Sequence, residues 1–324
     1  MTTVIRAARA AVAPAEDTAA AVRLAGRAAR ECLTEARVSP DAVGVLINVG
    51  VYREHNTFEP AIGALVQKEA GINLDYLAHR VPGAAFSFDL MNGACGVLNA
   101  VQVAQALLAT GTTERVLITA ADVHPGGNAA LDDAYPYADL GAALLLERSA
   151  QDRGGFGPVR SARSDEESKS AGYLRTAGMG ATGRSRITVR RDPGFAEQLL
   201  DLASDTVADY AWSEELDLHR TLLVSSRPTP DFAARLADRL GLPRSAVLAP
   251  DTPGAPGAAA TPGAPGAAAT PGTGGGGLPH TAAPILGYLH AVEHGLPEGV
   301  DQLLLVAVGA GPSAACVSYR PQEA

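Results

Sequence analysis

The hydrophobic and polar positions of the chain form two kinds of pattern that follow one another along its length. Short apolar runs, rich in β-branched residues and bounded by glycine, proline or charged residues, predict buried strands. These runs lie at Thr2–Ala13, Val43–Tyr52, Phe86–Phe88, Glu114–Val123, Tyr137–Arg148, Thr221–Ser226, Leu303–Val308 and Ala314–Ser318. Helical spacing predicts helices at Asp17–Ala36, Pro60–Glu69, Val97–Leu107, Phe195–Tyr210, Asp231–Leu240 and Leu278–Gly295. Their alternation predicts an α/β protein.

Three stretches lack both patterns and are expected to lie outside the core. Residues from Asp122 to Tyr137 are dominated by glycine, proline, asparagine and aspartate, which predicts a loop. The charged segment Arg160–Leu174 predicts an exposed connector. Residues 252–277 repeat the unit TPGAPGAAA and then add glycines. This composition cannot bury a core, so we expect a disordered insert there.

Composition and charge narrow the classes of function. Hydrophobic residues make up 47% of the 324 residues, enough to bury a sizeable core. The net charge of −9 argues against nucleic acid or an anionic membrane as the partner. No apolar window suits a membrane span, and the N-terminal residues lack the apolar centre of a signal peptide. Three cysteines without metal-site spacing fit a reducing cytoplasm. We therefore expect a cytoplasmic protein that uses no metal and no cofactor.

The stretch from Phe86 to Leu107 carries the candidate chemistry. It is predicted to run from a strand through a tight turn to Cys95 and into a helix. A cysteine in the first turn of a helix meets the positive end of the helix dipole, which favours the nucleophilic thiolate and lowers the thiol pKa. The small residues Gly93 and Ala94 leave room for a substrate carbonyl. The structural alternative is that Cys95 is a small core residue.

The segment FDLMNGACGVLNAV resembles the nucleophile segment of the thiolase superfamily, and within it the ketoacyl synthase III-like condensing enzymes. Further segments resemble that family in the same order, from about Val43 to the C-terminus. They are ERVLITAADV, YADLGAALLLER and LLLVAVGAGPSAACVSY. The resemblance implies a duplicated thiolase fold with five layers, α-β-α-β-α. It divides the chain into an N-terminal half, residues 1–150, and a C-terminal half, residues 151–324.

The resemblance also implies a catalytic set. In the family, a cysteine takes the acyl group from a thioester, and a histidine and an asparagine act on the second substrate. Cys95 matches the cysteine. The stretch VSSRPTPDF places Ser225 or Ser226 where the histidine is expected, and PHTAAP places His280 at, or within one residue of, the asparagine position. The predicted catalytic residues are therefore Cys95, His280 and Ser226. The backbone N–H groups of Cys95 and Ala310 are predicted to form the oxyanion hole.

The implied activity is acyl transfer from an acyl carrier protein or coenzyme A thioester to a small-molecule acceptor, through an acyl-Cys95 intermediate. A decarboxylative Claisen condensation and transfer to oxygen or nitrogen both remain open. The altered site and the Ala/Pro/Gly insert suggest specialised biosynthesis of the polyketide or antibiotic type. We expect a homodimer, paired through the strand beside the nucleophile segment. The alternative is a catalytically impaired partner subunit of a heterodimeric condensing enzyme. An unrelated cysteine-dependent hydrolase would need a different fold.

Overall fold

The computed structural model describes residues 2–13, 19–73, 85–129, 132, 135–151, 154–165, 170–252, 277–309 and 311–322. Two larger sheets form the body of the protein. The first has the order β1-β5-β4-β2-β3, and the second has the order β11-β10-β12-β13-β6, with β7 also paired to β13. The strands of the first are β1 (Thr2–Val12), β2 (Val45–Asn48), β3 (Phe86–Asp89), β4 (Arg115–Asp122) and β5 (Leu140–Ser149). Those of the second are β6 (Gly155–Phe156), β7 (Arg160–Arg163), β10 (Thr221–Ser225), β11 (Val247–Leu248), β12 (Gln302–Gly309) and β13 (Ser313–Arg320).

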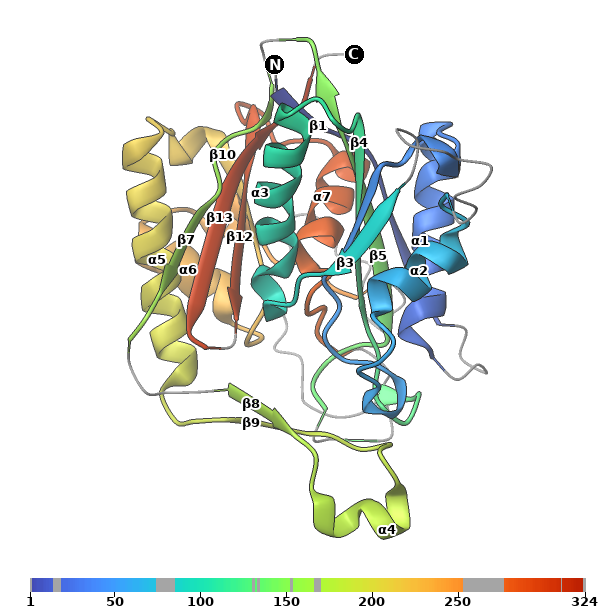
Figure 1. Ribbon diagram of the computed structural model, residues 1–324. Helices are drawn as coiled ribbons and strands as arrows, with labels where there is room; N and C mark the ends of the chain where they lie inside the picture. Colours follow the sequence, from blue (N-terminus) through green and yellow to red (C-terminus); the bar gives the residue numbers. More distant parts are fainter. Residues whose placement is uncertain are drawn as a thin grey trace.

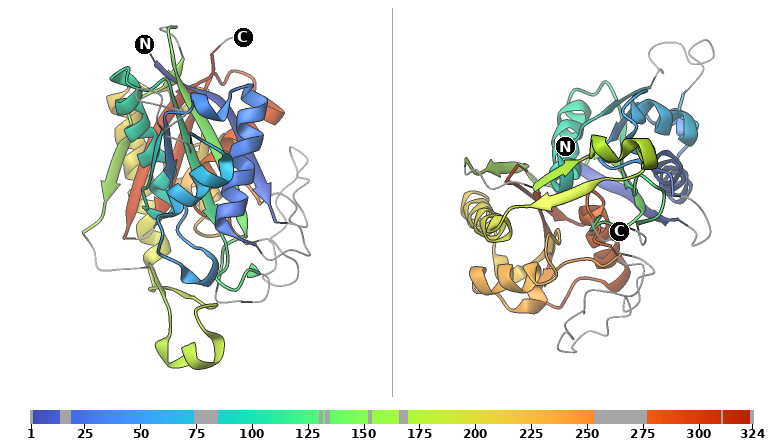
Figure 2. Two further views of the ribbon diagram at one scale, coloured as in Figure 1. Left: turned by 45° about the vertical axis from the view of Figure 1, so that its right-hand side comes forward. Right: turned by 90° about the horizontal axis from the view of Figure 1, so that it is seen from below.

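Helices lie between and outside the two sheets, which gives five layers (Figures 1 and 2). Helices α3 (Gly96–Ala109) and α7 (Ala283–His294) occupy the middle layer. Helices α1 (Ala21–Ala36) and α2 (Ile62–Ala70) cover the outer face of the first sheet. Helices α5 (Phe195–Ser213) and α6 (Phe232–Leu240) cover that of the second. The five predicted layers are confirmed. None of the helices in the described ranges is long and apolar enough to cross a membrane.

Three buried apolar clusters hold the layers together. One lies between the two sheets, and one lies on the outer face of each sheet. The central cluster contains α3, α7 and the inner faces of both sheets, and each outer cluster contains one outer pair of helices. Along strand β12, successive side chains point to opposite faces of the sheet. Leu305 and Ala307 belong to the central cluster, and Leu304 and Val306 belong to the outer cluster of the second sheet. A strand buried on both faces reads as a continuous apolar run, which is why the pattern predicted it.

The chain crosses from the first sheet to the second near residue 150. Strands β1–β5 lie within residues 2–149, and β6, β7 and β10–β13 lie within 155–320. The division into two domains at residue 150 stays a prediction, although the two sheets come from either side of it. The predicted helix start at Asp17 lies outside the described residues, and α1 begins at Ala21. Residues 253–276 of the predicted insert also lie outside the described ranges.

The described residues of Arg160–Leu174 are exposed or half-buried, as predicted, but the segment is more than a connector. This segment contains β7, which pairs with β13, and β8 (Ser170–Tyr173), which pairs with β9 (Thr188–Arg191). Strands β8 and β9, with the short helix α4 (Met179–Thr182) between them, form an arm that projects from one end of the body (Figure 1). The side chains of the arm are exposed or half-buried, so its strands lack the alternation of apolar and polar residues by which a strand is predicted from sequence.

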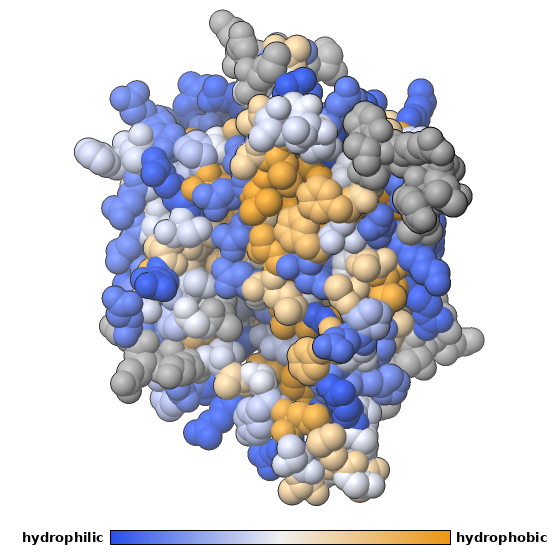
Figure 3. Space-filling model, viewed as in Figure 1, coloured by the Kyte–Doolittle hydropathy of each residue, from blue (hydrophilic) through white to orange (hydrophobic). Residues whose placement is uncertain are grey.

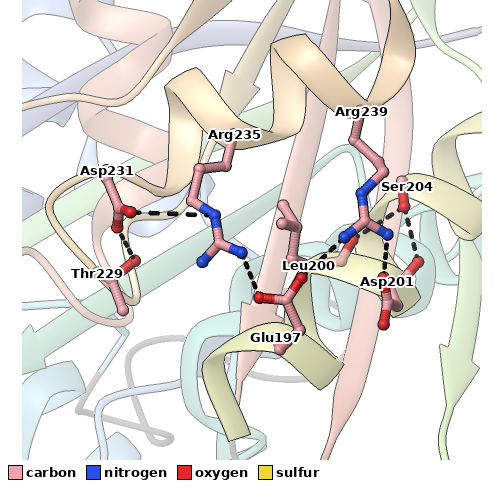
Figure 4. A network of polar contacts seen from close by, with 8 residues as sticks. All are labelled: Glu197, Leu200, Asp201, Ser204, Thr229, Asp231, Arg235 and Arg239. Atoms are coloured by element: carbon pink, nitrogen blue, oxygen red, sulfur yellow. Dashed lines mark hydrogen bonds and ion pairs between the residues drawn. The ribbon is translucent and has the colours of Figure 1, made fainter. Parts of the chain in front are cut away.

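Ion pairs on the surface link the two outer helices of the second sheet. Glu197 and Asp201 of α5 pair with Arg235 and Arg239 of α6 (Figure 4). These side chains are largely solvent-exposed, so their contribution to stability is small.

Candidate active site

The polar centre of the structure joins the end of β4 to the start of α7. Asp122 is the last residue of β4, and His280 lies three residues before the first residue of α7. The His280 Nδ1 atom lies 3.0 Å from Asp122 Oδ2. The imidazole packs against the ring of Tyr137, with the ring centroids 4.2 Å apart. These contacts fix the position and the plane of the imidazole.

Asp122 is buried and accepts hydrogen bonds from both halves of the chain. Its Oδ1 atom accepts from the N–H groups of Val51 and Tyr52, both at 2.9 Å. Its Oδ2 atom accepts from the Thr281 hydroxyl at 2.7 Å and the Thr281 N–H at 3.1 Å, as well as from His280. Burial by itself would raise the pKa of Asp122, but the adjacent His280 and these hydrogen bonds hold it at about 2.

Because Asp122 is ionised at neutral pH, it has no proton to donate to the imidazole. His280 must therefore carry a proton on Nδ1, and the Nε2 atom of neutral His280 is left with a free lone pair. A carboxylate that orients a histidine in this way prepares the opposite nitrogen to act as a general base.

Cys95 lies at the start of α3, as the sequence predicts. A short 3₁₀ turn, Gly93–Cys95, leads into the helix, and Gly93 adopts a φ of +49° that suits glycine. The Cys95 side chain is buried, with its Sγ atom 3.4 Å from the carbonyl oxygen of Ala307 and 3.6 Å from the Ser313 hydroxyl.

The expected fall in the Cys95 thiol pKa is wrong for this arrangement. Burial raises the pKa of the thiol to about 11, and a hydrogen bond with Ser313 only partly opposes this effect. The main cause is that a buried thiolate loses its solvation by water.

The other predicted catalytic groups are already engaged in hydrogen bonds. The Ser226 hydroxyl accepts from the N–H of Val308 at 2.9 Å, which ties the end of β10 to β12. The N–H of Cys95, predicted to donate to an oxyanion, donates to the carbonyl of Asn92 at 3.1 Å. Ala310, the second predicted oxyanion donor, lies outside the described residues.

A small cavity of about 30 Å³ brings part of the predicted set together. Ser226 and His280 both line it, but Cys95 does not. The preceding residue, Ala94, lines it instead, together with Gly309 of β12. The cavity has room for a reacting group such as a carbonyl. Its outer wall includes Arg191.

Sequence reasoning missed Asp122, which it treated only as the polar end of a strand. A signal was available, since a carboxylate directly after a buried strand is a common site residue in α/β proteins. His124, within the predicted loop, is also buried, and its Nε2 atom lies 3.0 Å from Asp132 Oδ2. Among the described residues, no group of three or more His, Cys, Asp or Glu side chains is placed to hold a metal ion.

No protein-family model and no curated protein sequence matches the chain. Solved structures match it over nearly its whole length. For 3-oxoacyl-(acyl carrier protein) synthase III, FabH, from Pseudomonas aeruginosa PAO1, the TM-score is 0.72 at 17% identity, covering 100% of this chain and 99% of that one. For Xanthomonas campestris OleA with bound lauric acid and lauroyl-CoA, the TM-score is 0.73 at 15% identity, covering 99% of both chains.

A third match is the priming β-ketosynthase of the R1128 polyketide biosynthetic pathway, with a TM-score of 0.71 at 15% identity, covering 99% of this chain and 97% of that one. All three are ketoacyl synthase III-like structures of the thiolase superfamily. The predicted fold class is therefore confirmed, and this protein has the duplicated thiolase fold. Identities this low establish the fold only, and function must be argued from the site.

Proposed function

We propose that this protein is an acyltransferase of the ketoacyl synthase III type. It takes an acyl group from an acyl carrier protein or coenzyme A thioester and passes it to a small molecule with a carbon, oxygen or nitrogen nucleophile. The observation that carries the proposal is that His280, held by the buried carboxylate of Asp122, lines a cavity close to the starts of α3 and α7. The altered catalytic set and the Ala/Pro/Gly insert favour a role in specialised biosynthesis of the polyketide or antibiotic type.

The chemistry available to His280 suits acyl transfer. Its Nε2 atom can take the proton of an attacking hydroxyl or amine and return it to the departing thiolate. A decarboxylative condensation needs further polar groups to stabilise an enolate. Ser226 is poorly suited to this role because its hydroxyl already accepts a hydrogen bond from the N–H of Val308. Of the two reactions left open by the sequence, transfer to oxygen or nitrogen therefore has the better support.

Positive charge surrounds the outer wall of the cavity. Arg191 and Arg227 line it, although the Arg227 guanidinium also pairs with the carboxylate of Asp251. Residues 170–191, which form the arm, contain five arginines and no acidic residue, although the whole chain has a net charge of −9. The arginines are Arg175, Arg184, Arg186, Arg190 and Arg191. This charge supports an anionic acyl donor, such as coenzyme A or an acidic carrier protein.

A second copy of the chain is the proposed partner at the edge of the first sheet. Strand β3 is the last strand of that sheet, with Phe86 52% exposed and Met91, just beyond it, 53% exposed. An apolar band runs over α3 and β3 on this face (Figure 3). An exposed, apolar edge strand favours pairing with another chain. A homodimer through β3 satisfies both the unpaired backbone and the apolar side chains.

The second candidate function is a partner subunit without catalysis of its own. The observation that favours it is that the residue lining the cavity next to the start of α3 is Ala94, which has no nucleophilic side chain, while Cys95 does not line it. Such a subunit would bind a catalytically competent relative through β3 in place of a second copy.

The experiment is a thioester cleavage assay with the purified protein. Lauroyl-CoA and acetyl-CoA are incubated with a panel of small alcohols and amines, and released coenzyme A is followed with a thiol-reactive dye. Replacing His280 by alanine should lower the rate by about two orders of magnitude or more, the usual scale for a general base. The matched control is His294→Ala, which alters an exposed histidine at the last residue of α7, the helix that follows His280.

The control variant should keep the wild-type rate. A His280→Ala rate close to that of the wild type would remove the base from the proposal. Thioester cleavage that appears only after a related condensing enzyme is added, and that survives His280→Ala, would favour the partner-subunit function.

A further inference from the structure

We propose that acyl transfer in this protein proceeds without an acyl-cysteine intermediate, because Ala94, and not Cys95, lines the cavity next to the start of α3. The acyl group passes directly from the thioester to the acceptor while His280 moves the proton. This inference rests on the proposed acyltransferase function and replaces the predicted step through Cys95.

The geometry at the start of α3 separates two neighbouring side chains. Ala94 lines the cavity together with His280 and Gly309. The approach to Gly309 is close, since a Cβ atom added there would lie 3.4 Å from the Ala94 Cβ atom. Cys95 belongs instead to the central apolar cluster, where its Sγ atom contacts Ala307 of β12 and Ser313 of β13.

The surroundings of the Cys95 thiol offer nothing that would activate it. The groups within hydrogen-bond distance of Sγ are two backbone carbonyls and the Ser313 hydroxyl, none of which accepts a proton at neutral pH. Burial raises the pKa of the thiol to about 11, so the thiol form predominates at pH 7. The side chain would also have to leave the core and turn towards the cavity before it could meet a thioester.

A single transfer step balances without the cysteine. The Nε2 atom of His280 takes the proton from the acceptor oxygen or nitrogen, which forms a bond to the thioester carbonyl carbon. The bond from that carbon to sulfur breaks, and the departing thiolate takes the proton from Nε2. The products are the acylated acceptor and a free thiol, and His280 returns to its starting form. Asp122 holds the imidazole throughout and stabilises its protonated form.

The test compares the full-length wild type with Cys95→Ala, Ala94→Cys and the double variant. Each protein is treated with lauroyl-CoA or with iodoacetamide, and the modified residue is located by peptide mass spectrometry. Melting temperatures confirm that each variant is folded. The cavity has room for the one heavy atom that Ala94→Cys adds, and Ala94→Ser is the matched control because it adds a similar volume without a thiol.

We expect no lauroyl group on any cysteine of the wild type, and no reaction of its Cys95 with iodoacetamide. Cys95→Ala should release coenzyme A at a rate within about threefold of the wild type, whereas loss of an obligatory nucleophile lowers turnover by several orders of magnitude. Ala94→Cys should acquire a lauroyl thioester at position 94, and the double variant should keep it.

Two outcomes would overturn the inference. The first is a lauroyl group on Cys95 of the wild type that disappears in Cys95→Ala, a result that leaves the proposed acyltransferase standing. The second is a folded Ala94→Cys that takes up neither lauroyl nor iodoacetamide, since position 94 would then not face the cavity. If the wild type releases no coenzyme A while Ala94→Cys is lauroylated, the result supports the position of residue 94 at the cavity. The proposed enzyme then fails in favour of the partner subunit.

Discussion

Replacing Asp122 by asparagine should destabilise the fold by about 3–4 kcal/mol. The pKa of Asp122 falls from its ordinary value of 3.8 to about 2, so the folded protein favours the charged form by about 2.5 kcal/mol. An asparagine oxygen can still accept from the N–H groups of Val51 and Tyr52. Its NH₂ group then faces the N–H of Thr281, which leaves a buried donor unsatisfied at a cost of about 1 kcal/mol or more.

The assay is differential scanning calorimetry. An unfolding entropy of about 2.1 cal/mol/K for each of the 324 residues gives about 0.7 kcal/mol/K, so the melting temperature should fall by about 5 °C. The matched control is Glu197→Gln, which removes an equal charge from the exposed pairs with Arg235 and Arg239 (Figure 4) and should have a much smaller effect.

The pH dependence gives an independent check on the same residue. Because the pKa of Asp122 is lower in the folded protein, its stabilisation is fully present above pH 4 and is lost as the pH falls towards 2. The gap between wild type and Asp122→Asn should stay constant from pH 5 to 7 and narrow below pH 4. Two results would refute the reasoning. One is a fall in melting temperature no larger than that of Glu197→Gln, and the other is a stability difference from the wild type that does not change with pH.

Three further predictions concern the insert, the close contact between Gly50 and Ala121, and the dimer. Replacing residues 253–276 by a short Gly-Ser loop should keep the melting temperature within a few degrees, because the Thr252 hydroxyl already donates to the Gly277 carbonyl at 2.6 Å and the ends lie together; a large fall would show that the insert packs on the body. Gly50→Ala should destabilise by about 1–3 kcal/mol in urea unfolding, since the new Cβ atom would lie 2.2 Å from the Ala121 carbonyl oxygen, and an unchanged midpoint would contradict this contact. Phe86→Glu should convert a dimer into a monomer in light scattering, and a monomeric wild type would exclude the homodimer.

The fold was largely accessible from the sequence because its cause is local and repetitive. The strands of the central layers are apolar on both faces, so they appear as uninterrupted runs such as Leu303–Val308, and the helices between them keep their spacing. The arm formed by β8, α4 and β9 was missed because its residues are small, polar and mostly exposed.

The candidate site depended on directions and distances that no local pattern contains. Asp122 and His280 are 158 positions apart, and only the packing of β4 against the start of α7 brings their side chains within 3.0 Å. The sequence by itself determined that a cysteine lies at the start of a buried helix. Ala94 and Cys95 are successive residues of a 3₁₀ turn, whose side chains point about 120° apart, so one of them can line the cavity while the other is buried in the core. The tertiary structure therefore decided that Ala94 faces the cavity and that Cys95 is buried against β12 and β13.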